Sequence, residues 1–396
     1  MTLIPELVLG GSLALWVYSY LGYPAILEVL SLFRRFTIPA DCPAPLPRIS
    51  ITLAVYNEAT VIADTLERIL AVDYPAERRQ ILVVSDASTD ETNEIVRRFA
   101  ARGVELLCLA ERHGKTAAEN AARPYLTGEI IVNTDASVRV DAQAVMCLVS
   151  AFADPSVGVA SGRDVSVAHE DDRTNPGEQA YVGYEMWVRG LETQVGGIVG
   201  ASGCLYAIRR DLHMQSTPDG LSRDFGAALV AREHRYRAVS VPGAVCYVPR
   251  STSLRQEYRR KVRTMARGLR TLWHRRALLD PRRYGVFAWM LWSHKLCRWL
   301  TPWAVLLAGA ALAALTPWHW WAAVILVLGL PTAIAWMWPE ERPLPRAVAL
   351  PSYAVSGTVA ALQAWINALG ARGTALWEPT RRGLTSRTAD RASRQA

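Results

Sequence analysis

Three polar clusters in the middle of the chain combine residue types that can bind phosphate, ribose or a metal ion. Each cluster directly follows a short run of aliphatic and β-branched residues. The three are Tyr56-Asn57-Glu58, Ser85-Asp86-Ala87-Ser88-Thr89-Asp90 and Thr134-Asp135-Ala136-Ser137. A carboxylate such as Asp86 can accept hydrogen bonds from a base or ribose, and one such as Asp135 can hold a divalent cation against a diphosphate. The pattern indicates a ligand site assembled from several strand ends.

Each cluster also has a plain structural interpretation. Asp and Ser are common in turns, which accounts for Asp135 as readily as metal binding does. Thr89 or Asp90 can cap a following helix, and Glu91 suits its first turn. Capping leaves Asp86 unexplained, because Asp86 comes at the strand end itself, where we expect it to point into a crevice.

Lys115 and Asp224 are candidates for phosphate binding and for proton transfer. Gly114-Lys115 opens a predicted helix, so Lys115 could meet a phosphate beside the helix amino terminus. A solvent-exposed lysine is the alternative. Asp224 lies in Leu221-Ser222-Arg223-Asp224-Phe225, whose composition does not distinguish a general base from a surface acid. A general base has to lie within hydrogen-bond reach of the hydroxyl that it deprotonates.

A basic segment from Tyr258 to Gly268, which includes Arg260 and Arg263, precedes the apolar C-terminal third of the chain. It has three interpretations. It is a solvated helix face, a surface that binds anionic lipid head groups, or a set of cations that neutralises a departing nucleoside diphosphate. Its position between a soluble domain and apolar segments favours the two functional interpretations over the first.

The elements that position these residues alternate between strand and helix. Short apolar runs predict strands at Ile49–Val55, Ile81–Val84, Val104–Leu109 and Glu129–Asn133. The spacing of apolar residues predicts helices at Ala59–Leu70, Glu91–Arg102 and Thr116–Tyr125. Such alternation implies a mostly parallel sheet that is covered on both faces. Ligands of these sheets bind beyond the carboxyl ends of the strands, where all three polar clusters fall.

Composition divides the chain into a soluble middle and apolar ends. The 396 residues are 51% hydrophobic, and the net charge is +8, from 44 Lys and Arg against 36 Asp and Glu. This length suggests about two to three structural units. The basic stretch directly precedes apolar segments, which favours a membrane surface over nucleic acid as a partner. None of the six cysteines forms a CxxC pair, which argues against a zinc site or a disulfide framework and suits the cytosol.

The first apolar segment, residues 7–31, is long enough to cross a bilayer. A signal peptide is the rival interpretation, but the segment lacks a basic amino-terminal region and a clear small-residue cleavage site. We therefore expect an uncleaved anchor. Arg34 and Arg35 follow it, and the positive-inside rule then places the middle domain in the cytosol.

The C-terminal third contains further apolar segments. Trp303–Leu315 with its flanking residues and Trp318–Trp338 are expected to span the membrane, the second with tryptophans at both ends. Tyr284–Leu300 mixes tryptophans with His, Lys and Arg, which predicts a helix lying in the interface. Val348–Leu369 is long enough to span, but an Arg-rich tail follows it. Either this segment is interfacial or re-entrant, or the positive-inside rule fails here.

Together these motifs resemble the family 2 glycosyltransferases of the GT-A fold, in particular their membrane-bound polysaccharide-synthase-like branch. The resemblance runs in order over residues 14–380. It rests on Gly22-Tyr23-Pro24, Val55-Tyr56-Asn57-Glu58, Ser85 to Asp90, Gly114-Lys115-Thr116, Asp135-Ala136-Ser137, Gly203 to Arg210, Asp224-Phe225 and Trp377-Glu378-Pro379-Thr380.

On the donor side, the resemblance implies that Tyr56, Glu58 and Asp86 hold the base and ribose of a nucleotide, with Lys115 nearby. Asp135 would be the first acid of the family's DxD motif. It would serve the metal–diphosphate, and the implied metal is Mg²⁺ or Mn²⁺. The metal would offset charge on the leaving diphosphate.

On the acceptor side, the resemblance implies that Asp224 is the general base of the family's ED or DD motif. It would deprotonate an acceptor hydroxyl for in-line attack at the anomeric carbon, with inversion to a β-linkage from an α-linked donor. The segment Ser202-Gly203-Cys204 would lie near the sugar and the acceptor. Arg260 and Arg263 would face the diphosphate or the membrane surface.

The chain departs from the family pattern at three places. Ser137 stands where the second DxD acid usually is, so metal binding rests more heavily on Asp135. Arg223 stands where the family often has a second acid, and its cation could lower the pKa of Asp224 and weaken it as a base. Gln256-Glu257-Tyr258-Arg259-Arg260 lacks the final Trp of the QxxRW motif of processive synthases, which favours single transfer over polymerisation.

We therefore expect an α/β GT-A domain inserted between N-terminal and C-terminal transmembrane helices. The expected regions are an anchor over 1–35, a cytosolic catalytic domain over 45–250, a basic linker with interfacial helices over 251–300, a membrane region of two to three helices over 301–370 and a basic polar tail over 371–396.

The expected function is that of an inverting glycosyltransferase in the inner membrane. It would move a sugar from a nucleotide-sugar donor, specifically a UDP-sugar, to a glycan or lipid-linked acceptor. The product would belong to exopolysaccharide or cell-surface glycan synthesis. Its partners would be the donor, the acceptor and membrane lipids, and not nucleic acid. The alternative is a catalytically degenerate subunit that scaffolds a membrane glycan-synthesis complex.

Overall fold

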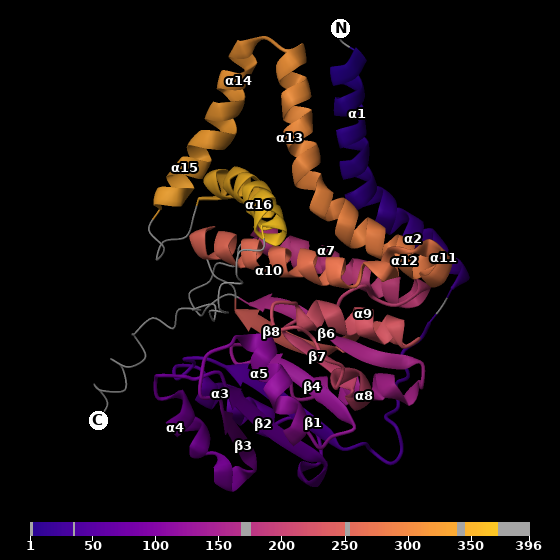
Figure 1. Ribbon diagram of the computed structural model, residues 1–396, viewed down its shortest axis with the longest axis vertical. Helices are drawn as coiled ribbons and strands as arrows, with labels where there is room; N and C mark the ends of the chain where they lie inside the picture. The colour runs from indigo at the N-terminus through magenta and orange to yellow at the C-terminus, as the bar shows by residue number, and fades with distance from the viewer. Residues whose placement is uncertain (1–2, 35, 168–175, 250–253, 339–344, 371–396) are drawn as a thin grey trace.

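The computed structural model describes residues 3–34, 36–167, 176–249, 254–338 and 345–370 (Figure 1). A mixed eight-stranded sheet with helices on both faces forms one end of the molecule, and apolar helices form the other. The predicted basic tail over 371–396, with its Trp377-Glu378-Pro379-Thr380 motif, lies outside the described residues.

Four parallel strands make up the first half of the sheet, in the order β3-β2-β1-β4. Their bounds are β1 Ile49–Val55, β2 Arg79–Ser85, β3 Val104–Cys108 and β4 Ile130–Asp135. Every residue of β1 is buried, as expected for an aliphatic strand that is covered on both faces. The pairing of β1 with β2 and β4, and of β2 with β3, confirms the predicted parallel arrangement.

The second half of the sheet lies beyond the strands that the sequence pattern predicts. β7, Leu205–Arg209, runs antiparallel between β4 and β6, Val157–Val167. β8, Arg237–Pro249, pairs with β6 in parallel, and the two-residue β5, Arg139–Val140, closes the edge. Register shifts interrupt the pairing of β6 with β8. Such bulges break the period-two alternation by which a strand is recognised in a sequence.

Helices cover both faces of the sheet and form a core with each. One core joins the sheet to α3 Ile62–Leu70, α4 Thr92–Arg97 and α6 Ala144–Ser150. The other joins it to α5 Lys115–Ala122, α8 Arg210–His213 and α9 Arg223–Glu233. Short 3-10 helices connect the elements at Ala76–Arg78, Ala100–Arg102, Arg123–Tyr125, Ala151–Ala153 and Arg276–Leu279.

Two long helices, α7 Pro176–Val195 and α10 Leu254–His274, lie between the sheet and the apolar helices (Figure 1). A third core fills this junction. Tyr23 and Phe287 from the apolar helices are buried there beside Leu229 of α9. The apolar helices are therefore packed onto the sheet domain and are not attached to it by linkers alone.

Two apolar helices rise from this junction and lie side by side (Figure 1). The first runs over Leu3–Phe33 as α1 Leu3–Val17, a π-helical turn Tyr18–Gly22 and α2 Tyr23–Phe33. The second runs over Val286–Leu315 as α12 Val286–Leu291, a π-helical turn Trp292–Cys297 and α13 Arg298–Leu315. A short helix, α11 Pro281–Tyr284, precedes it. By length and composition, each of the two long helices is able to cross a membrane.

The polar residues of Tyr284–Leu300 have a different explanation from the interfacial helix expected for them. From Val286 onward this stretch runs without a break into α13, and His294 is 2% exposed. His294 Nδ1 lies 2.5 Å from Glu192 Oε1 and His294 Nε2 lies 3.0 Å from Glu185 Oε2, both on α7. Arg298 also pairs with Glu185. The polar side chains are buried partners of α7, because a buried charge has to be paired.

The remaining helices close the C-terminal part that the structure describes. α14 Trp318–Val324, a π-helical turn Ile325–Gly329 and α15 Leu330–Met337 form one helical run, where a span is expected. α16 Arg346–Leu369 packs along α10, and the Arg270 Nη2 donates to the Asn367 carbonyl at 2.7 Å. This packing attaches the ambiguous last segment to the helix that covers the sheet domain.

Gly128 allows the chain to enter β4 beside the start of β1. A Cβ at Gly128 would lie 2.4 Å from the carbonyl carbon of Ile49, a backbone atom that cannot move aside. We expect Gly128→Ala to lower the free energy of unfolding by about 1–3 kcal/mol. Thermal unfolding of the detergent-solubilised protein measures this.

Gly183→Ala is the matched control, because a Cβ at this exposed position of α7 meets nothing within 4 Å. Inside a helix this change should be neutral or stabilise by about 0.5–1 kcal/mol. Equal loss of stability in both variants would contradict the packing described for Gly128.

Candidate active site

The carboxyl ends of β1, β2 and β4 lie at one edge of the sheet, and the three polar clusters follow them there. The first two clusters are bonded to each other. The Thr89 amide donates to Asn57 Oδ1 at 2.8 Å, and the Glu58 amide donates to Thr92 Oγ1 at 2.9 Å. Asn57 has a φ of 52°, in the left-handed region that asparagine tolerates.

Asp86 is buried and does not point into a crevice, contrary to the prediction from its position at the strand end. It is 0% exposed, and its Oδ1 and Oδ2 accept hydrogen bonds at 2.8 Å from the amides of His113 and Gly114. Gly114 has a φ of 95°, which glycine adopts at little cost, so the loop is closely specified. In this structure Asp86 fixes the start of α5, and with it Lys115, and does not point into an open crevice.

An aromatic ring and a guanidinium group are stacked beside this loop. The Arg112 Cζ lies 3.7 Å from the centroid of the Tyr56 ring. Arg112 belongs to the loop whose backbone Asp86 holds, and Glu58, at 9% exposed, is two residues after Tyr56. Flat groups of this kind can stack on a planar ring system such as a nucleobase.

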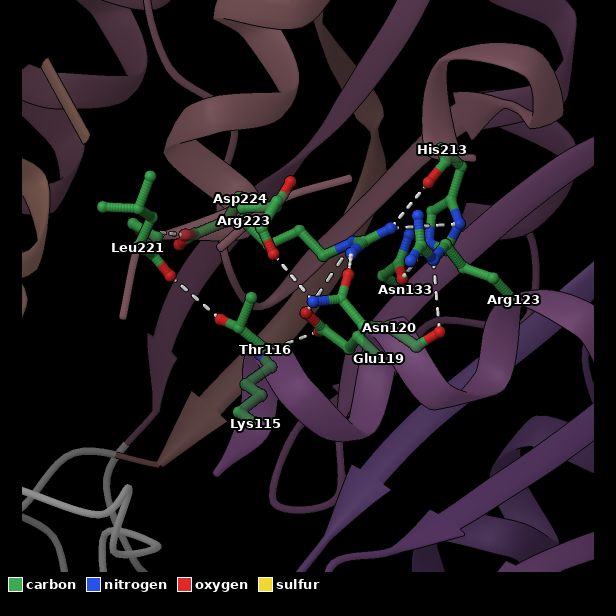
Figure 2. A network of polar contacts seen from close by, with 12 residues as sticks. Lys115, Thr116, Glu119, Asn120, Arg123, Asn133, His213, Leu221, Arg223 and Asp224 are labelled. Carbon is green, nitrogen blue, oxygen red and sulfur yellow. Dashed lines mark hydrogen bonds and ion pairs between the residues drawn. The ribbon is translucent and has the colours of Figure 1, made fainter. Parts of the chain in front are cut away.

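Lys115 and Asp135 form a close ion pair at the end of β4 (Figure 2 shows Lys115 with its neighbours). Lys115 Nζ lies 2.5 Å from Asp135 Oδ1 and 3.9 Å from Glu119 Oε1. Burial acts to lower the pKa of Lys115, but the carboxylates of Asp135, Glu119 and Asp224 outweigh it and raise that pKa above its ordinary value. The site therefore holds a permanent cation beside the Asp135 carboxylate.

A second layer of charges is buried behind this pair. Arg223 is 6% exposed, and its guanidinium runs toward His213 (Figure 2). It donates to Asn120 Oδ1 at 2.5 Å and to the His213 carbonyl at 2.6 Å, and its Nε lies 4.0 Å from Glu119 Oε2. Burial raises the pKa of Glu119, against the opposing effect of Lys115 and Arg223. Arg223 thus joins α9 to α5.

Asp224 lies directly against the glycine of the Ser202-Gly203-Cys204 segment. A Cβ at Gly203 would fall 2.5 Å from Asp224 Oδ2, so only glycine permits this approach. The Ser222 hydroxyl donates to Asp224 Oδ1. Asp224 is partly exposed in the first turn of α9.

Two contacts hold the Ser202-Gly203-Cys204 segment in place. The Ser202 hydroxyl donates to the Asp164 carboxylate of β6, at 2.7 and 2.8 Å from its two oxygens. The Thr134 hydroxyl, next to Asp135, donates to the Cys204 carbonyl at 2.9 Å. Through these contacts the structure brings Asp135, Lys115, Gly203 and Asp224 together at one edge.

The basic helix α10 reaches the site through a residue that the sequence does not single out. Arg260 donates two hydrogen bonds of 2.8 Å to Glu257 on its own helix, and Arg263 is half-buried on the same helix. Arg267 Nη2 instead donates to Thr116 Oγ1 at 2.5 Å and to the Leu221 carbonyl at 2.7 Å. Arg267 lies two helical turns after Arg260, a spacing that could have indicated a shared face.

Glu119 and Asp164 are two further residues of the site for which sequence reasoning has no signal. Glu119 lies inside a predicted helix, where a glutamate is ordinarily exposed. Asp164 lies in β6, a strand that the pattern does not reveal. Their importance comes from tertiary contacts with Lys115 and Ser202, which spacing along the chain does not encode.

The residues present fit a divalent cation only together with a bound diphosphate. Among the described residues, no group of three His, Cys, Asp and Glu side chains is placed to hold a metal ion. Asp135 is one carboxylate, its side chain is 26% exposed, and half-buried Ser137 lies two residues on. Mg²⁺ and Mn²⁺ can be bound by one or two carboxylates when phosphate oxygens complete the shell.

A pocket of about 870 Å³ lies elsewhere, at the amino end of β4. Glu129 and Arg209 line it, and they flank the edge of the sheet opposite to Asp135. It contains none of the predicted site residues.

The Lys115–Asp135 pair can be tested with amine labelling, because the chain contains three lysines, Lys115, Lys261 and Lys295. A raised pKa lowers the fraction of reactive free amine by about tenfold per unit. At about pH 9 we therefore expect acetylation of Lys115 to be at least about tenfold slower than that of Lys261, whose side chain is 43% exposed. Mass spectrometry of the peptides gives both rates.

Asp135→Asn should speed the labelling of Lys115 and leave Lys261 unchanged, because it removes the nearest carboxylate. Equal rates for the two lysines in the unaltered protein would mean that the ion pair does not persist in solution.

Comparison with known proteins identifies the domain that carries this site. The family model "Glycosyl transferase family 2" matches residues 50–216, which include β1 to β4 and Gly203. A beta-monoglucosyldiacylglycerol synthase from Nostoc sp. is 27% identical over 209 residues, 50% of this chain and 45% of that protein. A poly-beta-1,6-N-acetyl-D-glucosamine synthase from Staphylococcus epidermidis is 28% identical over 149 residues, 37% of this chain and 35% of that protein. The chain spans about half the length or less of these curated relatives.

A solved structure extends the similarity to nearly the whole chain. The mannosyltransferase PcManGT from Pyrobaculum calidifontis, in complex with GDP-Man and Mn2+, has a TM-score of 0.71 and 25% identity. The match covers 92% of this chain and 100% of that one. The sheet order, the converging strand ends and these similarities agree, and residues 50–216 form a family 2 glycosyltransferase domain with the GT-A fold.

Proposed function

We propose that this chain is a membrane-associated, inverting glycosyltransferase. It transfers a sugar from a nucleotide-sugar donor, specifically a UDP-sugar, to an acceptor at the membrane surface. The observation that carries the proposal is the meeting of Lys115 and Asp135 with Gly203 and Asp224. Lys115 and Asp135 suit a diphosphate. Gly203 and Asp224 place a carboxylate where an acceptor hydroxyl could be deprotonated.

On the donor side, the Tyr56 ring and the Arg112 guanidinium would hold the base, and Glu58 would contribute to its recognition. Asp86 would act by fixing the loop that carries Arg112 and Lys115. The mannosyltransferase with the same fold was solved with GDP-Man, which supports a nucleoside diphosphate sugar as the donor class. The preference for UDP rests on the family resemblance.

The diphosphate would lie beside the Lys115 ammonium. Asp135 would hold Mg²⁺ or Mn²⁺ with Ser137 and the phosphate oxygens, in keeping with the Mn2+ bound to the mannosyltransferase. When bound, the metal would offset the negative charge that builds up on the leaving diphosphate. Lys115 and Arg267 add two cations from the protein itself, and Arg267 is attached to the first turn of α5 through Thr116.

Asp224 would be the general base. The Ser222 hydroxyl donates to its Oδ1, so Oδ2, beside Gly203, is the oxygen that would take the proton from the acceptor hydroxyl. The freed oxygen would attack the anomeric carbon from the face opposite the diphosphate, which inverts the configuration. The Arg223 guanidinium bonds Asn120 and the His213 carbonyl and lies near Glu119, so it is directed toward these groups and not toward Asp224.

The acceptor would be a glycan or a lipid-linked sugar that reaches the site from the membrane. The helices Leu3–Phe33 and Val286–Leu315 would anchor the chain in the inner membrane, with the GT-A domain in the cytosol. The beta-monoglucosyldiacylglycerol synthase among its relatives acts on a lipid, as its name says. Because Arg260 stands where the QxxRW motif has its Trp, one sugar would be added per acceptor.

A catalytically degenerate scaffold subunit is the second candidate. It is favoured by Ser137 in place of an acid and by Arg223 in place of the acid before Asp224. A scaffold would bind the nucleotide tightly without releasing a product from any donor. A panel of nucleotide sugars with Mn²⁺ and purified protein distinguishes the two, because only the enzyme releases a nucleoside diphosphate.

Asp224→Asn tests the assignment of the base. The amide cannot accept the proton at neutral pH, so we expect the rate of transfer to fall by about 10²–10⁴-fold. Donor binding should be unchanged, because Asp224 would touch the acceptor and not the base or ribose. Nucleoside diphosphate release and donor titration give the two quantities, and full activity in this variant removes the assignment.

Gly203→Ala tests the close approach of the acceptor segment to Asp224. The added methyl group would displace the carboxylate, and a shift of about 1 Å costs on the order of 10² in rate. We expect kcat to fall by that factor while the KM for the donor changes little.

Gly226→Ala is the control for this variant, on the same helix as Asp224. Its Cβ would make an ordinary contact of 3.7 Å with Thr271 Cγ2, so activity should stay within a few-fold of the unaltered protein. If both glycine variants are equally impaired, the loss reflects helix packing and not the position of Asp224.

A further inference from the structure

Two cations lie between the apolar helices and the sheet domain without the partners that their neighbours have. Arg189 is on α7, and Lys295 is in the π-helical turn of the helix Val286–Leu315. His294, the residue before Lys295, contacts Glu185 and Glu192, which lie about one turn before and after Arg189 on α7, so the two cations share one region of the junction. Neither belongs to the donor site or to the general base.

Arg189 is buried in an unusual way for an arginine. Its Nε and Nη1 are fully buried and have no hydrogen-bond partner in the part of the chain that the structure describes. Glu185 and Glu192, one turn away on either side along α7, are already occupied. His294 bonds both of them, and Tyr23 donates to Glu192 at 2.6 Å.

Lys295 reaches toward the segment that leads to the acceptor side of the site. A Cβ at Gly200 would lie 3.6 Å from Lys295 Cε, and the Lys295 ammonium lies 5.7 Å from the centroid of the Phe225 ring. Lys295 has no hydrogen bond or ion pair within the described ranges. Phe225 directly follows Asp224, and Gly200 comes three residues before Gly203.

A buried guanidinium whose donors lack partners, as in Arg189, is expensive in a protein interior, and a second cation nearby adds to the cost. Each buried donor that lacks an acceptor carries the full desolvation penalty of the group, and like charges add repulsion. Such orphan groups in a folded protein ordinarily mark a place where a ligand, ion or water completes the bonding. Guanidinium and ammonium groups together are suited to a phosphate, which accepts several charge-assisted hydrogen bonds.

The surroundings indicate that the phosphate belongs to a lipid. Beyond Lys295, α13 continues with aliphatic side chains that are about half exposed, at Val305, Leu306 and Leu307. An anion held at Lys295 would therefore have an apolar surface next to it on one side and the Gly200–Gly203 segment on the other. A lipid with a phosphate head group and hydrocarbon chains matches this arrangement.

We propose that Arg189 and Lys295 form a subsite for the phosphate of a lipid-linked acceptor, on the membrane side of Asp224. The inference rests on the proposed function, and it narrows the acceptor to a phosphate monoester or diester carried by a membrane lipid. Binding there would place the remainder of the head group beside Gly203, where the general base lies.

Amine labelling of the full chain in detergent tests the subsite, with Lys261 as an internal control. The probe is dihexanoyl phosphatidic acid, and its neutral counterpart is dihexanoylglycerol. We expect the phosphatidic acid to slow the acetylation of Lys295 and to leave Lys261 unchanged. Equal protection by dihexanoylglycerol, equal protection by inorganic phosphate at the same concentration, or no protection would each overturn the proposal. The first removes the role of the phosphate, and the second assigns the pair to a free anion.

Arg189→Met separates a binding role from a structural one. We expect the phosphatidic acid concentration needed for protection to rise by about tenfold to a hundredfold, because one charge-assisted contact is lost. The melting temperature should stay the same or rise, because an unpartnered buried charge is removed. Unchanged protection with a lower melting temperature would mean that Arg189 is structural and would overturn the proposal.

Arg97→Met is the matched control, because Arg97 is an exposed arginine of α4 that pairs with Glu94. It should leave protection of Lys295 unchanged. Nucleoside diphosphate release without acceptor, measured in the same samples, should be equal in the unaltered protein and Arg97→Met. If no sample turns over any donor, the proposed function fails, whereas the labelling of Lys295 still reports on the subsite.

Discussion

The ion pair between Lys115 and Asp135 is the contact on which the arrangement of the site depends. Two acids, Asp135 and Asp224, lie close to one lysine, and without a cation their charges would repel. The Lys115 ammonium, 2.5 Å from Asp135, offsets that repulsion. Asp86 fixes the backbone from which Lys115 extends, and Gly203 sets the approach of Asp224. Asp135 at the end of β4 and Asp224 at the start of α9 are therefore held near each other by one shared cation.

The apolar helices are part of the same arrangement. Tyr23 and His294, one from each helix, both bond Glu192 near the end of α7. The chain continues from α7 through Gly196 to Gly203 and then into β7. Glu192 also accepts a hydrogen bond of 3.4 Å from the Val199 amide, inside that segment. The positions of the two apolar helices and the geometry beside Asp224 are thereby mechanically linked.

The first half of the sheet could be predicted because its strands are continuous apolar runs. Ile49–Val55 appears as predicted, and its neighbours differ by one or two residues at their ends. The second half could not, since β6 and β8 are interrupted by register shifts. The site likewise contains residues that could be predicted from the sequence and residues that could not. Strand-end position pointed to Asp135, whereas burial of Asp86 and the contact of Arg267 with Thr116 depend on how distant segments fold together. The polar residues near His294 suggested a helix at the membrane interface. Their buried partners could not be recognised, because they lie about a hundred residues earlier in the chain.

The binding of Mn²⁺ tests most directly whether Asp135 and Lys115 form a nucleoside diphosphate site. Electron paramagnetic resonance measures free Mn²⁺ in the presence of the protein, with and without UDP. We expect the protein to retain Mn²⁺ only when UDP is present, because Asp135 alone supplies too few ligands. Asp135→Asn should abolish this retention, and Asp224→Asn should preserve it. Retention of Mn²⁺ with UDP that is as strong in Asp135→Asn as in the unaltered protein would contradict the account.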